Sequence, residues 1–261
     1  MISGFASAAT LNQLQKKIDT ISNNIANANT PGFKGRSVTF ADVLSSEYLN
    51  QPNESRLTPH GLRVGTGSKP AQTQLSTAQG ALQETGRELD FALTEPNLFY
   101  TIETGAGERL TRDGSFYYSE TPGGILQLVT KNGDRVLNEV GEPMTLPANT
   151  SSLEWRGGQL VAQLADGREQ AIGTFGITRV DRPQALEAVG ENQFSAESVG
   201  VYAEAIGPAT EQIQQKSIEA ANVDIGQEMA DLMATQRQMQ FQARAFTFSD
   251  DMAGLVNTIR R

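Results

Sequence analysis

The strongest constraint on this chain is a pair of amphipathic helical patterns, one at each end of the sequence. In the first, apolar residues recur at alternating steps of three and four, the spacing of a heptad seam. The seam residues are Leu11, Leu14, Ile18, Ile21 and Ile25. Mostly polar residues fill the positions between them, so this helix has one apolar stripe that requires a partner. The pattern ends at Asn29-Thr30-Pro31-Gly32, because proline disfavours helix at the preceding residue and glycine permits a turn.

The carboxyl end repeats this design over a longer run, with two overlapping stripes of large apolar residues. Their seam members are Ile225, Met229, Leu232, Met239, Phe246, Met252, Leu255 and Ile259. One explanation is an ordinary helix that packs on its own domain. Matching patterns at opposite ends of one chain favour a second, in which the two helices pair with each other and with other copies. Two offset stripes also widen the apolar face, which allows contact with more than one neighbour.

Between the helical ends, short runs of β-forming residues alternate with turn signals at intervals of about ten residues, which is typical of an antiparallel β domain. Asn132-Gly133, between the runs 125–129 and 135–137, is a strong hairpin signal. Asp113-Gly114 and Asp166-Gly167 are also predicted hairpin turns. The expected core residues are Leu89, Phe91, Leu93, Phe99, Ile102, Leu110, Phe116, Leu126, Leu128, Val136, Leu153, Trp155, Leu160, Ile172, Phe175 and Ile177.

These patterns predict a mixed α and β fold in which the amino- and carboxyl-terminal helices pair as a coiled-coil-like core and the centre is an antiparallel all-β domain. The terminal helical core domain is expected to span 1–35 and 211–261. The central β domain is expected at 86–185, and extended connectors are expected at 36–85 and 186–210.

Composition excludes several classes of site. The 261 residues include no cysteine and one histidine, so thiolate chemistry is impossible and a Ser-His-Asp triad could use only His60. Asp+Glu 30 against Lys+Arg 21 gives a net charge of -9 without a basic cluster, so no nucleic-acid partner is expected. No apolar run approaches the roughly 18 residues of a membrane span, so no stable membrane insertion is expected. The amino end lacks a basic leader, so no cleaved secretion signal is expected.

Two patches with a superficial likeness to catalytic motifs do not support enzymatic readings. Gly65-Thr66-Gly67-Ser68-Lys69-Pro70 lacks the Gly-Lys-Ser/Thr order of a phosphate loop, and its proline would interrupt the helix that binds phosphate. Asp250 and Asp251 are adjacent, so on a helix their carboxylates point about 100° apart. The sequence therefore predicts no catalytic, cofactor-binding or metal-ligating residues and no cofactor.

The residues at both ends resemble those of the flagellar rod and hook protein family. The stretch 22–34, Ser-Asn-Asn-Ile-Ala-Asn-Ala-Asn-Thr-Pro-Gly-Phe-Lys, is similar to the amino-terminal family signature. Its signature residues are Asn23, Asn24, Asn27, Asn29, Thr30, Pro31, Gly32 and Phe33. Residues 222–246 are similar to the family's closing helix, and 61–67, 89–93 and 111–116 are similar to its distal rod members. Departures at 94–99 and 48–57 leave open a paralogous rod subunit of Gram-positive spore-formers.

The resemblance implies a structural subunit of the bacterial distal rod that polymerises into a hollow helical shaft, transmits motor torque and serves as an export channel. Paired terminal helices would form the inner tube, with the β domain outside it. The implied partners are other copies of the chain, other rod subunits and the hook protein. The implied location is the flagellar basal body, reached through the flagellar type III export apparatus. Phe40 and Leu44 fit that family's export-gate pattern, although the same spacing also fits a single contact within a helix.

Other functions stay open at this point. Within the family, a hook or proximal-rod subunit is the alternative. Outside it, the chain could be a secreted oligomeric adhesin with a β domain or, on weaker grounds, a hydrolase that uses Asp and Glu. Loss of assembly on deletion of the ends would distinguish the structural readings from an enzyme, whose activity would depend on a pocket.

Overall fold

The computed structural model describes residues 2–42, 45–48, 62–65, 68–121, 124–195, 203–206 and 212–259. By internal contacts the chain forms two compact units. Unit 1 contains Met1–Ala26, Arg36–Gln74 and Asp224–Arg261, and unit 2 contains Asn27–Gly35 and Leu75–Val223. Residues 27–35, expected with the helices, belong to unit 2, because their hydrogen bonds run to β-domain residues.

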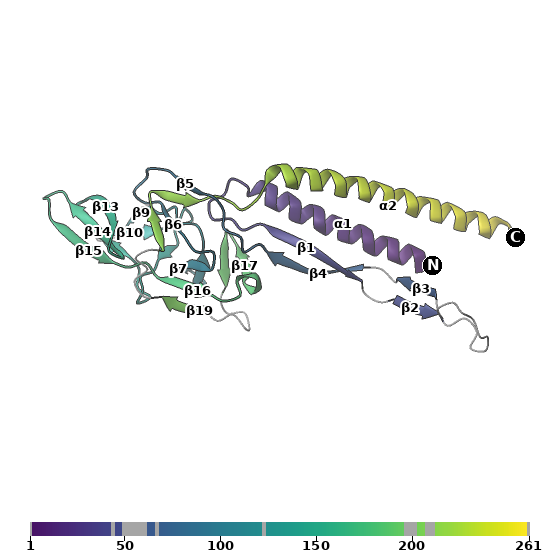
Figure 1. Cartoon of the computed structure of the whole chain (residues 1–261), viewed down its shortest axis with the longest axis horizontal. Helices are drawn as coiled ribbons and strands as arrows, with labels where there is room; N and C mark the ends of the chain where they lie inside the picture. Colours follow the sequence, from purple (N-terminus) through teal and green to yellow (C-terminus); the bar gives the residue numbers. More distant parts are fainter. Residues whose placement is uncertain are drawn as a thin grey trace. The chain divides into compact units, whose positions relative to one another are not determined.

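Unit 1 consists of the two terminal helices and two strand pairs. Helix α1 spans Ile2–Ala26 and helix α2 spans Ile225–Ile259. They lie side by side and antiparallel, and the carboxyl end of α2 extends beyond the amino end of α1 (Figure 1). The strands are β1 (Arg36–Asp42), β2 (Ser45–Tyr48), β3 (Leu62–Gly65) and β4 (Ser68–Leu75). β1 pairs with β4, and β2 pairs antiparallel with β3. The predicted pairing of the chain ends is confirmed.

Unit 2 is built from short antiparallel strands. Those in its first half are β5 (Leu82–Glu84), β6 (Phe91–Leu93), β7 (Leu98–Thr104), β8 (Gly107–Thr111), β9 (Tyr117–Glu120), β10 (Leu126–Val129), β11 (Arg135–Val136) and β12 (Thr145–Leu146). Those in its second half are β13 (Thr150–Arg156), β14 (Gln159–Leu164), β15 (Glu169–Gly173), β16 (Ile177–Val180), β17 (Glu187–Gly190), β18 (Gln193–Ser195), β19 (Ala203–Ile206), β20 (Ile213–Gln215) and β21 (Ser217–Glu219). A short 3-10 helix, η1, spans Pro183–Ala185.

Among the described residues, the main sheet has ten strands in the order β12-β10-β11-β7-β8-β18-β17. Strand β16 also pairs with β7, β19 with β16, and β9 with β10. A separate sheet has the order β13-β14-β15, and the closing strands of the unit pair as β20 with β6 and β21 with β5. The predicted antiparallel β architecture is therefore confirmed. Strands β1 to β5 fall within residues 36–85, where an extended connector was expected.

The core of unit 2 is aromatic and aliphatic. Phe91, Tyr100, Phe116 and Phe175 are each completely buried, and the rings of Phe91 and Phe175 lie 4.8 Å apart between centroids. Every core residue expected from the sequence lies in one of two buried clusters or packs against the larger one, as Trp155 does. Aromatic pairs at such separations add to the stabilisation that comes from burial alone.

Two of the predicted turns form hairpins and one does not. The Asn132-Gly133 turn joins β10 to β11, and the Asp166-Gly167 turn joins β14 to β15. The Asp113-Gly114 prediction is wrong, because β8 and β9 on either side of it pair with other strands. A Cβ on Gly114 would lie 1.7 Å from the carbonyl oxygen of Phe91, so this glycine serves a close approach of two backbones.

Candidate functional site

The two helices of unit 1 meet through a mixed apolar and polar face. On α1, the seam residues Leu14 and Ile21 are buried, while Leu11, Ile18 and Ile25 are half-buried. On α2, Leu232 and Met239 are half-buried, and these are the only two of its seam residues with described side chains that are covered in this way. The most buried residue of α2 is a polar one, Thr235, whose hydroxyl donates to the carbonyl oxygen of Asp231 at 2.7 Å.

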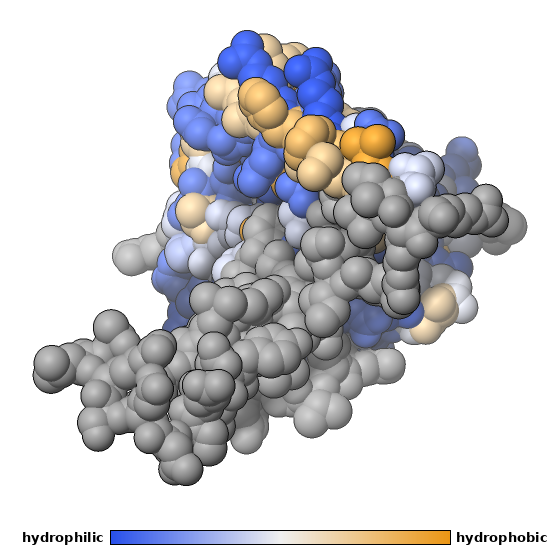
Figure 2. All heavy atoms as spheres, turned by 90° about the vertical axis from the view of Figure 1, so that its right-hand side faces the viewer, coloured by the Kyte–Doolittle hydropathy of each residue, from blue (hydrophilic) through white to orange (hydrophobic). Residues whose placement is uncertain are grey.

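Most of the apolar surface of α2 is left uncovered. At 100° per residue, Met233, Phe241 and Phe248 lie about 120° to 160° around the helix from Thr235. Their exposed fractions are 55%, 70% and 67%. The other exposed large apolar residues of α2 are Ile225, Met229, Phe246, Met252 and Leu255. Phe246 lies only about 20° from Thr235, whereas the other seven lie at least about 80° from it. We call these seven residues the α2 apolar face. Figure 2 shows apolar residues, in tan and orange, at the top of the view among hydrophilic ones in blue.

An exposed apolar surface of this extent usually marks a binding surface, because isolated apolar side chains on a protein surface are ordinary but contiguous ones are not. The sequence predicted these positions as part of a seam between the helices. In the structure α1 covers a different side of α2, so Ile225 and Met229 remain exposed. None of the helices in the described part of the chain is long and apolar enough to span a membrane.

Asn24, a signature residue, closes the helix pair at the end of α1. Its amide Nδ2 donates to Glu228 Oε1 at the start of α2 and to the carbonyl oxygen of Arg36 in β1, each at 2.8 Å. Its Oδ1 accepts the backbone N–H of Arg36 at 2.9 Å. Only 2% of Asn24 is exposed, so a shorter side chain here would leave buried polar groups without partners.

A cavity of about 130 Å³ lies in unit 1 beside this contact. Two cations, Lys17 and Arg36, and two carboxylates, Glu228 and Asp231, contribute to its lining. Ligand pockets are usually larger, at roughly 300 to 1,000 Å³. The balanced charges favour neither an anion nor a metal cation.

The remainder of the signature forms a tight loop in unit 2. The loop turns at Asn27, whose carbonyl oxygen accepts the N–H of Thr30 at 3.0 Å, and the carbonyl oxygen of Pro31 accepts a hydrogen bond from Asn192 at 3.0 Å. Gly32 has φ +66°, a left-handed conformation, and its N–H donates to the carbonyl oxygen of Glu219 at 2.7 Å. A Cβ on Gly32 would lie 2.5 Å from the backbone of Arg112, so both the backbone angle and the available space require glycine.

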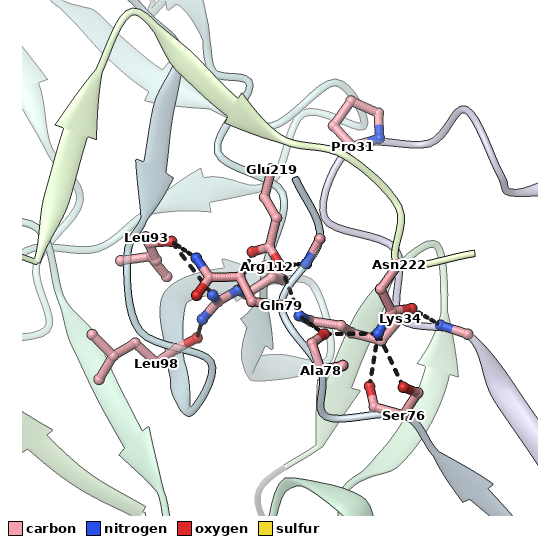
Figure 3. A network of polar contacts seen from close by, with 12 residues as sticks. Pro31, Lys34, Ser76, Ala78, Gln79, Leu93, Leu98, Arg112, Glu219 and Asn222 are labelled. Atoms are coloured by element: carbon pink, nitrogen blue, oxygen red, sulfur yellow. Dashed lines mark hydrogen bonds and ion pairs between the residues drawn. The ribbon is translucent and has the colours of Figure 1, made fainter. Parts of the chain in front are cut away.

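Below this loop, three charged side chains form a buried cluster, shown in Figure 3. Glu219 Oε1 lies 2.7 Å from Lys34 Nζ, and Glu219 Oε2 lies 2.6 Å from Arg112 Nε. The side chains of all three are at most 2% exposed. We call Lys34, Arg112 and Glu219 the ion cluster.

Backbone groups complete the ion cluster. Lys34 Nζ donates to the carbonyl oxygen of Ala78 at 2.9 Å, the N–H of Gly80 donates to Glu219 Oε1 at 2.8 Å, and Arg112 donates to the carbonyl oxygen of Leu98. Burial lowers the pKa of Lys34, and its attraction to Glu219 opposes that shift. The cluster holds one more cation than carboxylate, so the carbonyl oxygens supply the remaining negative partners.

Asn222 joins the two chain segments beside the cluster. Its Oδ1 accepts the N–H of Gly35 at 2.7 Å, and its Nδ2 donates to the carbonyl oxygen of Ala78 at 2.7 Å (Figure 3). Its own N–H donates to the carbonyl oxygen of Phe33 at 3.3 Å. The segment that follows α1 and the segment that precedes α2 are therefore fixed to each other within unit 2.

The other predicted site residues have different settings. Asn23 and Asn29 are exposed, and Phe33 is half-buried. Phe40 lies in strand β1, so the alternative of a contact within a helix is wrong. Its partner in the export-gate pattern, Leu44, lies outside the described residues.

Sequence reasoning missed the three members of the ion cluster as a group. Lys34 and Arg112 both stand in stretches that resemble the family, and Glu219 stands among small and apolar residues shortly before Asn222. An acidic residue in such surroundings is the signal that could have indicated a buried charge, but its cationic partners are 185 and 107 positions away in sequence.

Comparison with known proteins places both ends of the chain in one family. The family described as "Flagella basal body rod protein" matches residues 6–34, and "Flagellar basal body rod FlgEFG protein C-terminal" matches residues 214–259. The flagellar hook-basal body complex protein FlhP of Bacillus subtilis is 36% identical over 97% of each chain. The flagellar basal-body rod protein FlgG of Borreliella burgdorferi is 32% identical over 98% of each chain, and FlgG of Bacillus subtilis is 29% identical over 98% of each. With relatives of this identity aligned along nearly its whole length, the chain belongs to the flagellar basal-body rod protein family, as a structural, non-enzymatic member similar to the distal rod proteins.

Proposed function

We propose that copies of this chain polymerise through the α2 apolar face into the hollow helical shaft of the flagellar distal rod. The observation that carries the proposal is the exposure of the seven large apolar residues of the α2 apolar face. Four of them are more than half exposed: Met233, Phe241, Phe248 and Leu255. Neither α1 nor any other described element covers this face. A second copy, or a related rod subunit with the same helical pattern, has the apolar surface to do so.

The position of the α2 apolar face bears on the kind of assembly that copies of the chain can form. The apolar face of α2 lies away from α1, so contact with another copy is added to the pair inside each chain. An open helix requires that the α2 apolar face of one copy contacts a different surface of the next copy, because contacts between identical surfaces close into dimers. An open helix with the terminal helices around its axis is a shaft with a central channel, suited to carrying torque and to passing later subunits.

The proposed partners and location come from the relatives. FlhP is named as a hook-basal body complex protein and FlgG as a basal-body rod protein. We infer that this chain contacts other rod subunits and the hook protein in the basal body, and that it reaches them through the flagellar type III apparatus. Phe40 and Leu44 are the proposed export-gate residues. Within the assembly we assign the inner tube to the helical core domain, 1–35 and 211–261, and keep 86–185 as the β domain with connectors at 36–85 and 186–210.

The test is to remove two aromatic residues from the α2 apolar face. The variant with Phe241→Ser and Phe248→Ser should fold with unchanged helix content, because both side chains are mostly exposed. It should fail to form filaments under conditions in which the parental chain does, measured by sedimentation and electron microscopy. The control is Gln238→Ser, an exposed polar change about 60° from Thr235 and outside the apolar face, which should polymerise normally. Normal filaments from the double variant would contradict the proposal.

A hook or proximal-rod subunit is the second candidate within the family. The carboxyl-terminal match covers a family description that joins FlgE, FlgF and FlgG, so it does not separate these positions. The full-length alignments with FlgG favour the distal rod. Electron microscopy of basal bodies from a strain that lacks the chain should show an axis that stops at the distal rod, whereas an intact rod with no hook would favour the alternative.

A further inference from the structure

We propose that Glu219 is a positioning residue, whose place in the ion cluster sets the register in which the two ends of the chain leave unit 2 and pair as α1 and α2. This inference deepens the proposed assembly but concerns the single chain, so it can be tested without a filament.

The physical need for such a device comes from helix geometry. A shift of one residue along α1 turns its faces by about 100° and moves them by about 1.5 Å. Leu14 and Ile21 would then leave the interface with α2, and neighbouring polar residues would enter it. The contact side of α2 is itself largely polar, with Thr235 at its centre. Apart from the hydrogen bond between Asn24 and Glu228, few large contacts in this interface would distinguish neighbouring registers.

The ion cluster distinguishes strongly between neighbouring registers of the two chain segments. A slip by one residue in the segment after α1 would bring Phe33 or Gly35 to the position of Lys34, and Glu219 would lose its partner at 2.7 Å. A slip in the segment before α2 would replace Glu219 by Ile218 or Ala220 and leave two buried cations without a carboxylate. An unpaired buried charge costs several kcal/mol, so each slipped register is strongly disfavoured.

Two further contacts fix the same alignment. The backbone of Gly32 approaches Arg112 so closely that any other residue would clash there. Asn222 bonds both to the N–H of Gly35 and, through its own N–H, to Phe33. The ion cluster therefore lies beside close backbone contacts that fix the same alignment of the two chain segments. Buried polar residues that fix register at some cost in stability are known from coiled coils.

The cysteine-free chain allows register to be measured by thiol cross-linking. Asn24 and Glu228 are joined by a hydrogen bond between their side-chain ends, so a short bifunctional thiol reagent should cross-link cysteines introduced by Asn24→Cys and Glu228→Cys in the native register. Two slipped registers are reported by Asn23→Cys or Ile25→Cys, each combined with Glu228→Cys. Because Asn24→Cys and Glu228→Cys remove that hydrogen bond, each cysteine pair is compared with the same pair in the parental background. There, the first pair should cross-link in dilute monomer in clear preference to the other two.

The decisive background is Lys34→Met combined with Glu219→Gln. This change removes one cation and one carboxylate, so the cluster keeps its excess of one cation, and Arg112 keeps its carbonyl acceptors, Leu98 and Leu93. Tryptophan fluorescence of Trp155 checks that unit 2 is folded, and the cross-links are compared in folded protein. We expect the preference for the native pair to be lost, with all three pairs cross-linking to similar extents. Glu219→Gln alone, which leaves two buried cations, should destabilise unit 2 more than the double change does.

The result that would overturn the proposal is a folded double variant that keeps the parental preference, since register would then be set by contacts between α1 and α2 alone. Failure of the filament tests above would leave these cross-linking results unaffected, because they are made on the monomer. If the cross-links report a lost register and the helices still polymerise, the positioning role stands and register is not required for assembly.

Discussion

The aromatic core of unit 2 and the helix α2 of unit 1 use the same residue types in opposite ways. In unit 2, Phe91, Phe116 and Phe175 are completely buried among their neighbours. In α2, Phe241 and Phe248 are about two-thirds exposed. Burial of a large apolar side chain contributes about 1.5 to 3 kcal/mol, so unit 2 has this stabilisation in the single chain, whereas α2 gains it only when another molecule covers it.

Unit 2 is therefore a folded module in the single chain, whereas α2 carries an interface that the single chain leaves uncovered. Unit 2 pairs its strands with one another and places three buried charges in the ion cluster. Unit 1 buries one side of each helix and leaves the other side of α2 uncovered. A subunit of this design can remain a monomer until other copies are present.

The largest expected effect comes from exchanging one phenylalanine in each region. Phe175→Ala should lower the free energy of unfolding of unit 2 by about 3 to 5 kcal/mol, because it leaves a cavity in a closed core. Phe248→Ala should change that free energy by less than about 0.5 kcal/mol, as expected of an exposed site, while reducing filament formation. Urea unfolding measures the free energy of unfolding, and sedimentation measures filament formation. Equal loss of stability in both variants would abolish the distinction between the regions.

Two glycine substitutions test the close approach of the signature loop to Arg112 in unit 2. Gly32→Ala combines a left-handed backbone with a clash against Arg112, so we expect a loss of at least about 3 kcal/mol. Gly167→Ala has a similar backbone angle, φ +81°, but open space around it, so about 1 kcal/mol is expected. Thermal unfolding of both variants tests the difference. Similar losses would mean that the close approach of the signature loop is not maintained in solution.

Two neighbouring asparagines provide the matching test in unit 1. Asn24→Ala removes the hydrogen bonds to Glu228 and Arg36 and should destabilise the helix pair by about 1 to 3 kcal/mol. Asn23→Ala, at an exposed position one residue earlier, should cost less than Asn24→Ala, because truncating an exposed polar group leaves its partner open to water. Hydrogen exchange at the end of α1 measures both. A larger loss of protection in Asn23→Ala than in Asn24→Ala would mean that Asn24 does not close the helix pair.

The smallest expected effect is a pH dependence in unit 2. Burial raises the pKa of Asp113 above 3.8, although hydrogen bonds from Ser115 oppose the shift. Between 3.8 and the raised value the folded state binds more protons than the unfolded state, so this carboxyl stabilises folding below pH 3.8 and loses that contribution as the pH rises through its raised pKa.

Asp113→Asn removes this titration while keeping an oxygen that can accept from Ser115. The variant should be at least as stable as the parent at pH 7, and its free energy of unfolding should lack the decrease that Asp113 causes above pH 3.8. Urea unfolding between pH 3.5 and 7 measures the two curves. A parental curve that rises more steeply with pH than that of the variant would reverse the assigned sign.

Much of the fold could be predicted from sequence because its signals are local. The three-four spacing of Leu14 and Ile21 predicts a helix, and Asn132-Gly133 predicts a hairpin, without knowledge of any distant residue. The same local view failed at Asp113-Gly114. Its turn chemistry is ordinary, but its position is set by the backbone of Phe91 more than 20 residues earlier.

The candidate site was predicted only in part, for the same reason. Periodicity identifies an apolar stripe on α2, but not which side of the helix α1 covers, and the polar Thr235 occupies the centre of that side. The signature loop was recognisable from its residues, whereas its buried partners Arg112 and Glu219 come from distant segments, just after β8 and in β21. Pairing between residues that lie more than 100 positions apart is decided by the fold as a whole.

Hydrogen exchange of α2 in the monomer and in the filament tests whether polymerisation covers the α2 apolar face. We expect residues 229–255 to gain strong protection on polymerisation, because other copies cover that face, while the strands of unit 2 exchange equally slowly in both states. Unchanged exchange of α2 in the filament, or full protection already in the dilute monomer, would contradict it.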